Sequence, residues 1–178
     1  MNYSDTWKTA IIPTDTVYGV VSRANDREAI ERIYKIKNRE AHKACLILLP
    51  NIRDINNWHL ELPGNFEEIV TKYWPGPVTL IFGIKHKALE ELHYLHRGTN
   101  ALAFRVPDDP QLRSFLAEYG PVIAPSANPA GQLPATTSDQ AREYFGNTID
   151  MYIDGGERNN KPSTIISFVD GDEKIIRE

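Results

Sequence analysis

Short runs of apolar, mostly β-branched residues alternate along this chain with segments of helical periodicity, and this alternation constrains the fold more than any other feature. Strand character is found in residues 9–12, 17–21, 44–49, 78–84, 101–106, 122–124, 151–154 and 164–169. Such alternation is typical of α/β domains, in which helices cover a sheet. Because 178 residues suit one domain, we predict a single α/β domain over residues 1–178.

Helical periodicity and end signals predict helices between these strands. The first begins at Asn25, with Glu28 as its capping-box partner. Residues 84–100 give no clear pattern, and Asp170-Gly171 predicts a hairpin that returns through residues 174–177. Three more helices are predicted over residues 65–73, 110–119 and 138–145.

The charge balance and the cysteine count exclude several classes of protein. Lys and Arg number 20 against 24 Asp and Glu, and the net charge of −4 excludes a globally basic nucleic-acid-binding protein. The single cysteine, Cys45, excludes an intramolecular disulfide framework, and its apolar neighbours predict a buried side chain. No apolar run approaches the about 18 residues of a membrane span, and the polar residues 1–10 lack a signal-peptide core. We therefore predict a cytoplasmic protein without a membrane partner.

Positive charge is concentrated between Arg23 and Lys43, where seven Lys or Arg residues stand against four acidic ones. Lys37 and Arg39 follow a predicted helix and precede a buried strand, and two residues apart in extended chain they point the same way. Such a pair can clamp phosphates. It can equally be a solvated helix end, where cations are favourable beside the helix dipole. The charge pattern alone leaves both interpretations open.

Polar side chains also gather at predicted strand ends, where α/β domains place ligands. Residues 13–19, PTDTVYG, are either a turn whose side chains bond the backbone or part of a ligand site. Residues 74–79, WPGPVT, are best explained as a helix stop followed by a strand, with Trp74 in the core. Arg105 lies inside an apolar run, so it needs either a structural counter-ion or a carboxylate ligand.

The segment 125–131, PSANPAG, puts Ser126 and Asn128 on one face at the end of a strand. No Gly-x-Ser-x-Gly elbow surrounds Ser126, so we expect this serine to hydrogen-bond a ligand rather than act as an acyl nucleophile. His93 and His96 lack the second ligand pair of a zinc site, and the chain has no Walker loop. We therefore predict no metal ligands in the chain.

Taken in order, these clusters resemble the YrdC-like family of threonylcarbamoyl-AMP synthases. The resemblance runs from about Ile11 to Arg177 and rests on PTDTVYG, KNR, WPGPVT, AFRVP, PSANPAG, DGG and PSTII. It implies a twisted mixed sheet flanked by helices around a concave cleft. It implies a nucleotidyltransferase that makes L-threonylcarbamoyl-AMP and pyrophosphate from L-threonine, bicarbonate and ATP. This product would serve threonylcarbamoyladenosine formation in tRNA, with tRNA-modification partner proteins and RNA contact as further expectations.

The resemblance also implies roles for individual residues. Catalytic roles fall on Lys37, Arg39, Ser126 and Asn128, and nucleotide contacts on Arg39, Lys43, Ser126 and Arg177. Substrate contacts fall on Thr14, Thr16, Tyr18, Arg105 and Ser163, with Arg105 facing the threonine carboxylate and Thr79 in the cleft wall. The cations would stabilise the negative charge that accumulates as pyrophosphate leaves, and Mg²⁺ would accompany ATP.

The sequence departs from the family pattern in three places. Only about ten residues precede Ile11, where the family usually has a helix, and Glu40 replaces the proline that commonly follows Lys-x-Arg. The chain ends at Glu178, so we expect it to lack the C-terminal domain found in the longer family members. Two alternatives stay open. A carbamoyl-transfer domain occurs beside zinc-finger Cys pairs that this chain lacks, and the net charge argues against a non-catalytic RNA-binding module.

Overall fold

One mixed sheet organises residues 6–178, which are the residues that the computed structural model describes. The first half of the polar stretch 1–10 lies outside these described residues. The sheet order is β10-β9-β5-β6-β3-β7-β2-β1-β8, with β4 paired to β5. The strands are β1 (Ala10–Ile12), β2 (Gly19–Arg23), β3 (Leu46–Leu48), β4 (Leu60–Glu61), β5 (Val78–Ile84), β6 (Ala101–Arg105), β7 (Val122–Ile123), β8 (Met151–Tyr152), β9 (Thr164–Ser167) and β10 (Lys174–Arg177).

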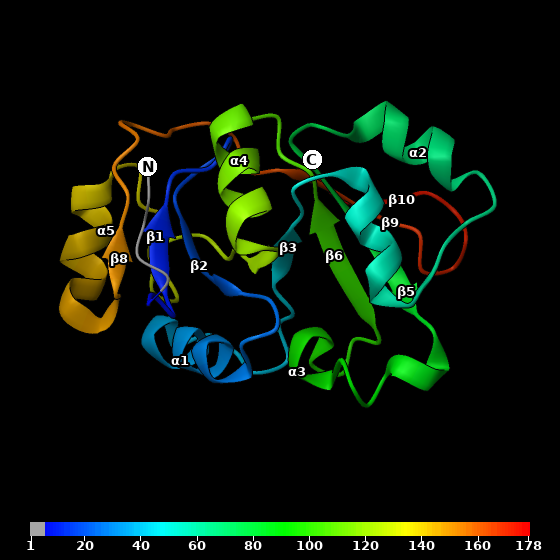
Figure 1. Ribbon diagram of the computed structural model, residues 1–178, viewed down its shortest axis with the longest axis horizontal. Helices are drawn as coiled ribbons and strands as arrows, with labels where there is room; N and C mark the ends of the chain where they lie inside the picture. Colours follow the sequence, from blue (N-terminus) through cyan, green and yellow to red (C-terminus); the bar gives the residue numbers. More distant parts are fainter. Residues whose placement is uncertain (1–5) are drawn as a thin grey trace.

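Parallel and antiparallel pairings are combined in this sheet. The pairs β1–β8, β3–β6 and β5–β9 are parallel, whereas β5–β6, β2–β7 and β9–β10 are antiparallel. Strand β8 with α5 lies at one side of the molecule, and β9 and β10 lie at the other (Figure 1). The expected α/β fold with a mixed sheet is confirmed.

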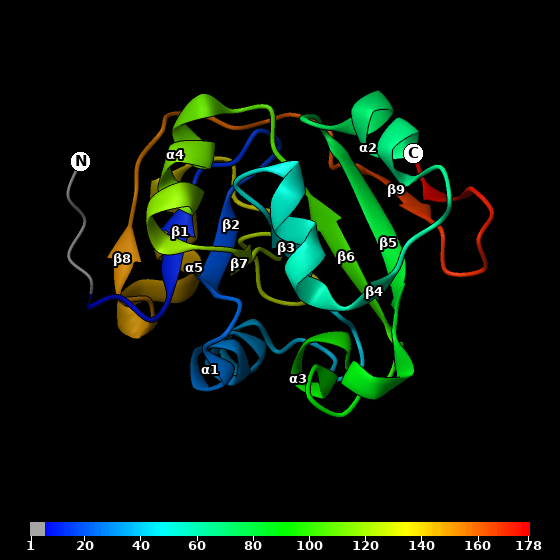
Figure 2. The ribbon, with the colours of Figure 1, turned by 45° about the vertical axis from the view of Figure 1, so that its right-hand side comes forward.

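Helices flank the sheet, with α1 and α3 beyond one end of the central strands and α2 near β5 and β9 (Figures 1 and 2). The α-helices are α1 (Arg27–Lys37), α2 (Phe66–Tyr73), α3 (His93–His96), α4 (Pro110–Tyr119) and α5 (Ser138–Phe145), and the 3₁₀ helices are η1 (Ile52–Trp58), η2 (His86–Ala88) and η3 (Gly146–Thr148). Among residues 6–178, no helix is both long enough and apolar enough to cross a bilayer.

The two faces of the sheet are filled differently, and this difference leaves room for a site. On β6, Leu102 and Phe104 point into the larger core, which also receives α1, α2 and α5. The opposite face is covered only in part, by α4, whose Leu112 and Leu116 form a smaller core with β1 and β2. Because strand side chains alternate between faces, Arg105 emerges on this second face.

The structure corrects one local prediction and assigns a stretch that the sequence left open. Helix α1 is capped by Asp26, whose side chain accepts a hydrogen bond from the Ala29 amide, and not by Asn25 with Glu28. Asx residues at adjacent positions are equally able to cap, so the sequence did not distinguish them. In the unassigned stretch 84–100, η2 and α3 form around the buried His96, whose ring bonds Leu89 O and the amides of Gly98 and Asn100. Cys45 and Trp74 are buried, as predicted.

Candidate active site

The uncovered part of the second sheet face forms a cavity of about 430 Å³. Its floor is made by small side chains, because Ala101 and Ala103 of β6 lie in the same alternating row as Arg105. Ile81 of β5 and Leu46 of β3 flank Ala103 in register, so the floor continues across three strands. The described residues that line this cavity include three arginines, Arg39, Arg105 and Arg177, and no carboxylate. The cavity therefore suits an anionic ligand.

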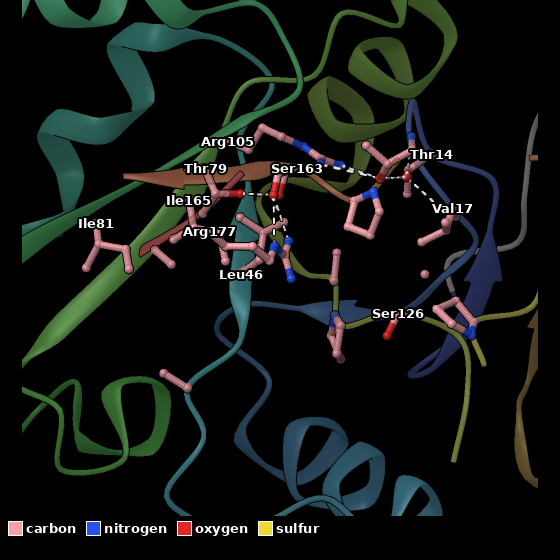
Figure 3. A pocket seen from close by; sticks show the side chains of 18 of the residues that line it. Thr14, Val17, Leu46, Thr79, Ile81, Arg105, Ser126, Ser163, Ile165 and Arg177 are labelled. Atoms are coloured by element: carbon pink, nitrogen blue, oxygen red, sulfur yellow. Dashed lines mark hydrogen bonds between the residues drawn. The ribbon is translucent and has the colours of Figure 1, made fainter. Parts of the chain in front are cut away.

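One wall is built from Thr14, Thr16 and Arg105. The Thr14 hydroxyl donates to Val17 O at 2.6 Å and lies 3.0 Å from the Thr16 hydroxyl, so the two threonines hold the turn together. Arg105, only 2% exposed, donates from Nη2 to Asp15 Oδ1 at 2.8 Å. Figure 3 shows Arg105 reaching across toward Thr14. The motif therefore forms a turn whose side chains bond the backbone, and Arg105 has a structural counter-ion. Both features lie at the wall of a cavity.

The opposite wall joins Thr79, Ser163 and Arg177, which lie together in Figure 3. The Thr79 and Ser163 hydroxyls are 2.8 Å apart and buried. Arg177 donates from Nε and Nη2 to Ser163 O, at 3.2 and 2.7 Å. These bonds fix the backbone of Ser163 beside the cavity.

A β-bulge puts Arg177 on the cavity face. Ile175 pairs with Ile166, but the next paired residue is Arg177, opposite Ile165. In a regular antiparallel ladder Ile176 would oppose Ile165, and Arg177 would point to the other face. The extra residue therefore turns the arginine side chain toward the cavity, as bulges do beside functional sites.

A third part of the site is the segment 126–128, which is held by a lysine. Lys37 is 3% exposed, and its ammonium group donates to Ser126 O and Asn128 O. The Ser126 hydroxyl, which lines the cavity, donates to Asn128 Oδ1 at 2.6 Å. Burial, with the neighbouring Arg39 charge, lowers the pKa of Lys37 to about 8. Lys37 thus supports the wall from behind instead of lining the cavity.

The side chains of Lys37 and Arg39, the predicted phosphate clamp, go to different places at the end of α1. Asn38 has φ 49°, in the left-handed region that asparagine tolerates, and there the chain leaves the helix. Arg39 then turns into the cavity lining and donates to Ala44 O at 2.8 Å. Lys43 is not among the lining residues; its ammonium group pairs with Glu40 at 2.7 Å on the surface. The structure brings Arg39, Ser126 and Arg177 to one cavity, and nucleotide contact by Lys43 stays a prediction.

Tyr18 links this cavity to the loop after β8. Its hydroxyl donates to Gly156 O at 2.8 Å and accepts from the Gly155 amide at 3.0 Å. A Cβ on Gly155 would lie 2.5 Å from Pro13 Cγ, so the close approach of this loop requires glycine. Burial raises the pKa of Tyr18, which keeps the phenol neutral.

Sequence reasoning missed two features of the site. Asp15, the counter-ion of Arg105, was passed over inside PTDTVYG, although an acid beside a buried arginine is the expected partner. The alanine floor was also missed, although the alternation of Ala101, Ala103 and Arg105 was visible in the sequence.

The described residues provide few side chains that could bind a metal ion. Within residues 6–178, no group of three or more His, Cys, Asp or Glu side chains could hold one. The cavity lining likewise contains no Asp or Glu among these residues.

Comparison with known proteins identifies the family of the chain. The Sua5/YciO/YrdC family model, described as "Telomere recombination", matches residues 7–178. The chain belongs to this family. The threonylcarbamoyl-AMP synthase of Marinobacter nauticus is 32% identical over 163 residues, which cover 90% of this chain and 85% of that protein.

Two solved members of the Sua5/YciO/YrdC family extend the comparison to structure. The crystal structure of P. abyssi Sua5 complexed with L-threonine matches with a TM-score of 0.86 at 29% identity, covering 96% of this chain and 50% of that one. E. coli YciO matches with a TM-score of 0.83 at 21% identity, covering 97% of this chain and 83% of that one, which supports the fold alone. The expected YrdC-like fold is confirmed.

Proposed function

We propose that this chain is a threonylcarbamoyl-AMP synthase that converts L-threonine, bicarbonate and ATP to L-threonylcarbamoyl-AMP, pyrophosphate and water. The observation that carries the proposal is the cavity, which among the described residues is lined by three arginines and several hydroxyls and by no carboxylate. Relatives named threonylcarbamoyl-AMP synthase, and a family structure complexed with L-threonine, support the same activity.

The proposed reaction has two bond-forming steps. The threonine amine attacks the bicarbonate carbon, and loss of water leaves a carbamate. A carbamate oxygen then attacks the α-phosphorus of ATP, and pyrophosphate leaves with the electrons of the broken P–O bond. Because negative charge accumulates on carbamate and phosphate oxygens as pyrophosphate leaves, the main need is positioning and cationic stabilisation.

The residues that line the cavity and support its walls fit these needs. Arg105 and Thr16 form a wall for the threonine carboxylate, since a guanidinium matches a carboxylate in two hydrogen bonds. Ser163 lines the facing wall and offers its hydroxyl to the same substrate. Arg39 and Arg177 contribute charge toward phosphate oxygens, and Ser126 contributes a hydroxyl. Lys37 and Asn128 act by holding the Ser126 segment.

Mg²⁺ fits as a companion of ATP rather than as a resident ion. The cavity lining offers no carboxylate among the described residues, so the phosphate oxygens and water would supply its ligands. Bound in this way, Mg²⁺ would neutralise phosphate charge.

The product is a mixed anhydride, which reacts readily with nucleophiles. We propose that it passes to tRNA-modification partner proteins, which transfer the threonylcarbamoyl group to adenosine. Contact of this chain with RNA and a cytoplasmic location belong to the same proposal.

The test is a reconstituted assay with ATP, Mg²⁺, bicarbonate and L-threonine. We expect pyrophosphate and threonylcarbamoyl-AMP, both lost when either bicarbonate or threonine is left out. Arg39→Ala should impair turnover at least tenfold, whereas Arg53→Ala, at an exposed position on η1, should leave it unchanged. Absence of any threonine-dependent product refutes the proposal, and tight, steeply salt-dependent RNA binding would then favour an RNA-binding module.

A further inference from the structure

Asp15 is the ion-pair partner of Arg105. Its carboxylate accepts the hydrogen bond from Arg105 Nη2 at 2.8 Å, and the two side chains are only 10% and 3% exposed. Asp15 is not among the residues that line the cavity, whereas Arg105 is. The side-chain contact that links Asp15 to the cavity is therefore its ion pair with Arg105.

The backbone that carries Asp15 is fixed independently of the arginine. Asp15 O accepts a hydrogen bond from the side-chain Nδ2 of Asn160 at 3.0 Å, and the backbone amide of Asn160 donates to Thr16 O at 3.2 Å. Thr14 Oγ1 accepts from the Thr16 amide at 3.1 Å. The carboxylate is thus held on an anchored turn and can orient the guanidinium.

The guanidinium is only partly occupied by this pairing. Its other hydrogen bonds to described residues are two long ones, from Nη1 and Nη2 to Thr16 Oγ1, both at 3.4 Å. An arginine has five N–H donors, so Arg105 keeps donor capacity for a ligand while one edge stays fixed. An oriented guanidinium binds a planar carboxylate with two parallel hydrogen bonds, and a disordered one does not.

The buried charge of Arg105 also requires a partner of opposite charge. Arg105 is buried, and the nearby Arg177 charge adds to the cost of keeping it charged. Asp15 offsets that cost before a ligand arrives, because an unpaired buried cation is strongly unfavourable.

We infer that Asp15 is a positioning residue that holds the Arg105 guanidinium ready for the carboxylate of the amino-acid substrate, an inference that rests on the function proposed above. Asp15 touches neither substrate nor reacting atoms. Through Arg105, it affects only the affinity for the carboxylate of threonine. Loss of the Asp15 charge should therefore weaken the binding of threonine but not the binding of ATP.

Asp15→Asn is the direct test, since the amide keeps the shape and removes the charge. In the synthase assay we expect the KM for L-threonine to rise at least tenfold, while the KM for ATP changes less than twofold. L-Threoninol, which lacks the carboxylate, serves as a competitive probe. Its inhibition constant should change less than twofold, because a structural disturbance would weaken both compounds whereas an Arg105 effect weakens only threonine.

Asp26→Asn is the matched control, because asparagine can still cap α1 and the site lies elsewhere. If Asp15→Asn does not fold, Asp15→Glu, which displaces the carboxylate by one methylene, should give the same threonine-selective loss. Equal weakening of threonine, threoninol and ATP, unchanged threonine affinity, or failure of both variants to fold would overturn the inference. A wild-type protein without threonine-dependent activity would instead refute the proposed function.

Discussion

Lys37 holds Ser126 from behind: the lysine ammonium donates to the backbone oxygen of Ser126, while the serine hydroxyl faces the cavity. The same ammonium donates to Asn128 O, so one buried cation fixes both ends of a three-residue segment. A lysine that meets carbonyl oxygens gains hydrogen bonds but no counter-charge, and burial then lowers its pKa to about 8.

The first prediction concerns the pH dependence of stability. The pKa of Lys37 is about 8 in the folded protein and about 10.5 when the chain unfolds. Between these values the unfolded state binds the additional proton, so Lys37 makes the free energy of unfolding rise with pH, by up to about 1.4 kcal/mol per pH unit. Denaturant titrations at pH 8–9.5 should show this slope in the wild type and in Lys35→Met, at an exposed position on α1, but not in Lys37→Met. Equal slopes in all three proteins would contradict the assignment.

The second prediction concerns the hydroxyl pair of Thr79 and Ser163. Thr79→Val keeps the shape but leaves the buried Ser163 hydroxyl without its partner at 2.8 Å. We expect a loss of about 1 kcal/mol in unfolding free energy. The KM for L-threonine should rise about threefold, since Ser163 loses its fixed orientation. Kinetics and denaturation on the same preparation check both effects, and Thr71→Val, on the exposed side of α2, should leave the KM unchanged.

The sequence predicted the parts of this fold that depend on local chemistry. The β-branched runs became strands, Pro110 began α4, and Gly120 ended it. These helices and strands could be predicted because burial patterns and helix-end signals depend on residues only a few positions apart.

Other features depend on distant backbone and could not be predicted. The partners of Lys37 are carbonyl oxygens, which every residue has, so nothing in the sequence distinguishes Ser126 and Asn128 as acceptors. The bulge at Ile176 appears only when β10 is paired with β9. The family resemblance places Lys37, Ser126 and Asn128 in a site together with Arg177. Only the structure shows that Ser126 and Arg177 line the cavity, whereas Lys37 and Asn128 support it.

The third prediction concerns His96, which is 2% exposed. Its Nδ1 accepts from the Gly98 and Asn100 amides, so Nε2 carries the proton and donates to Leu89 O. His96→Ala leaves two amides and a carbonyl without partners, and we expect a loss of about 3 kcal/mol in unfolding free energy. His93→Ala, at an exposed position of the same helix, should lose less than about 0.5 kcal/mol, as surface substitutions do. Similar losses would show that the ring does not organise this loop.

The fourth prediction tests the bulged arginine. Arg177→Met removes one of the three arginines that line the cavity within residues 6–178, and with it both hydrogen bonds to Ser163 O. We expect the KM for ATP to rise about tenfold, because phosphate oxygens lose a cationic partner at short range. Lys174→Met, on the same strand but with an exposed side chain outside the cavity lining, should change that KM less than twofold. If the two variants behave alike, the bulge does not serve nucleotide binding, and Arg177 acts only by holding the backbone of Ser163.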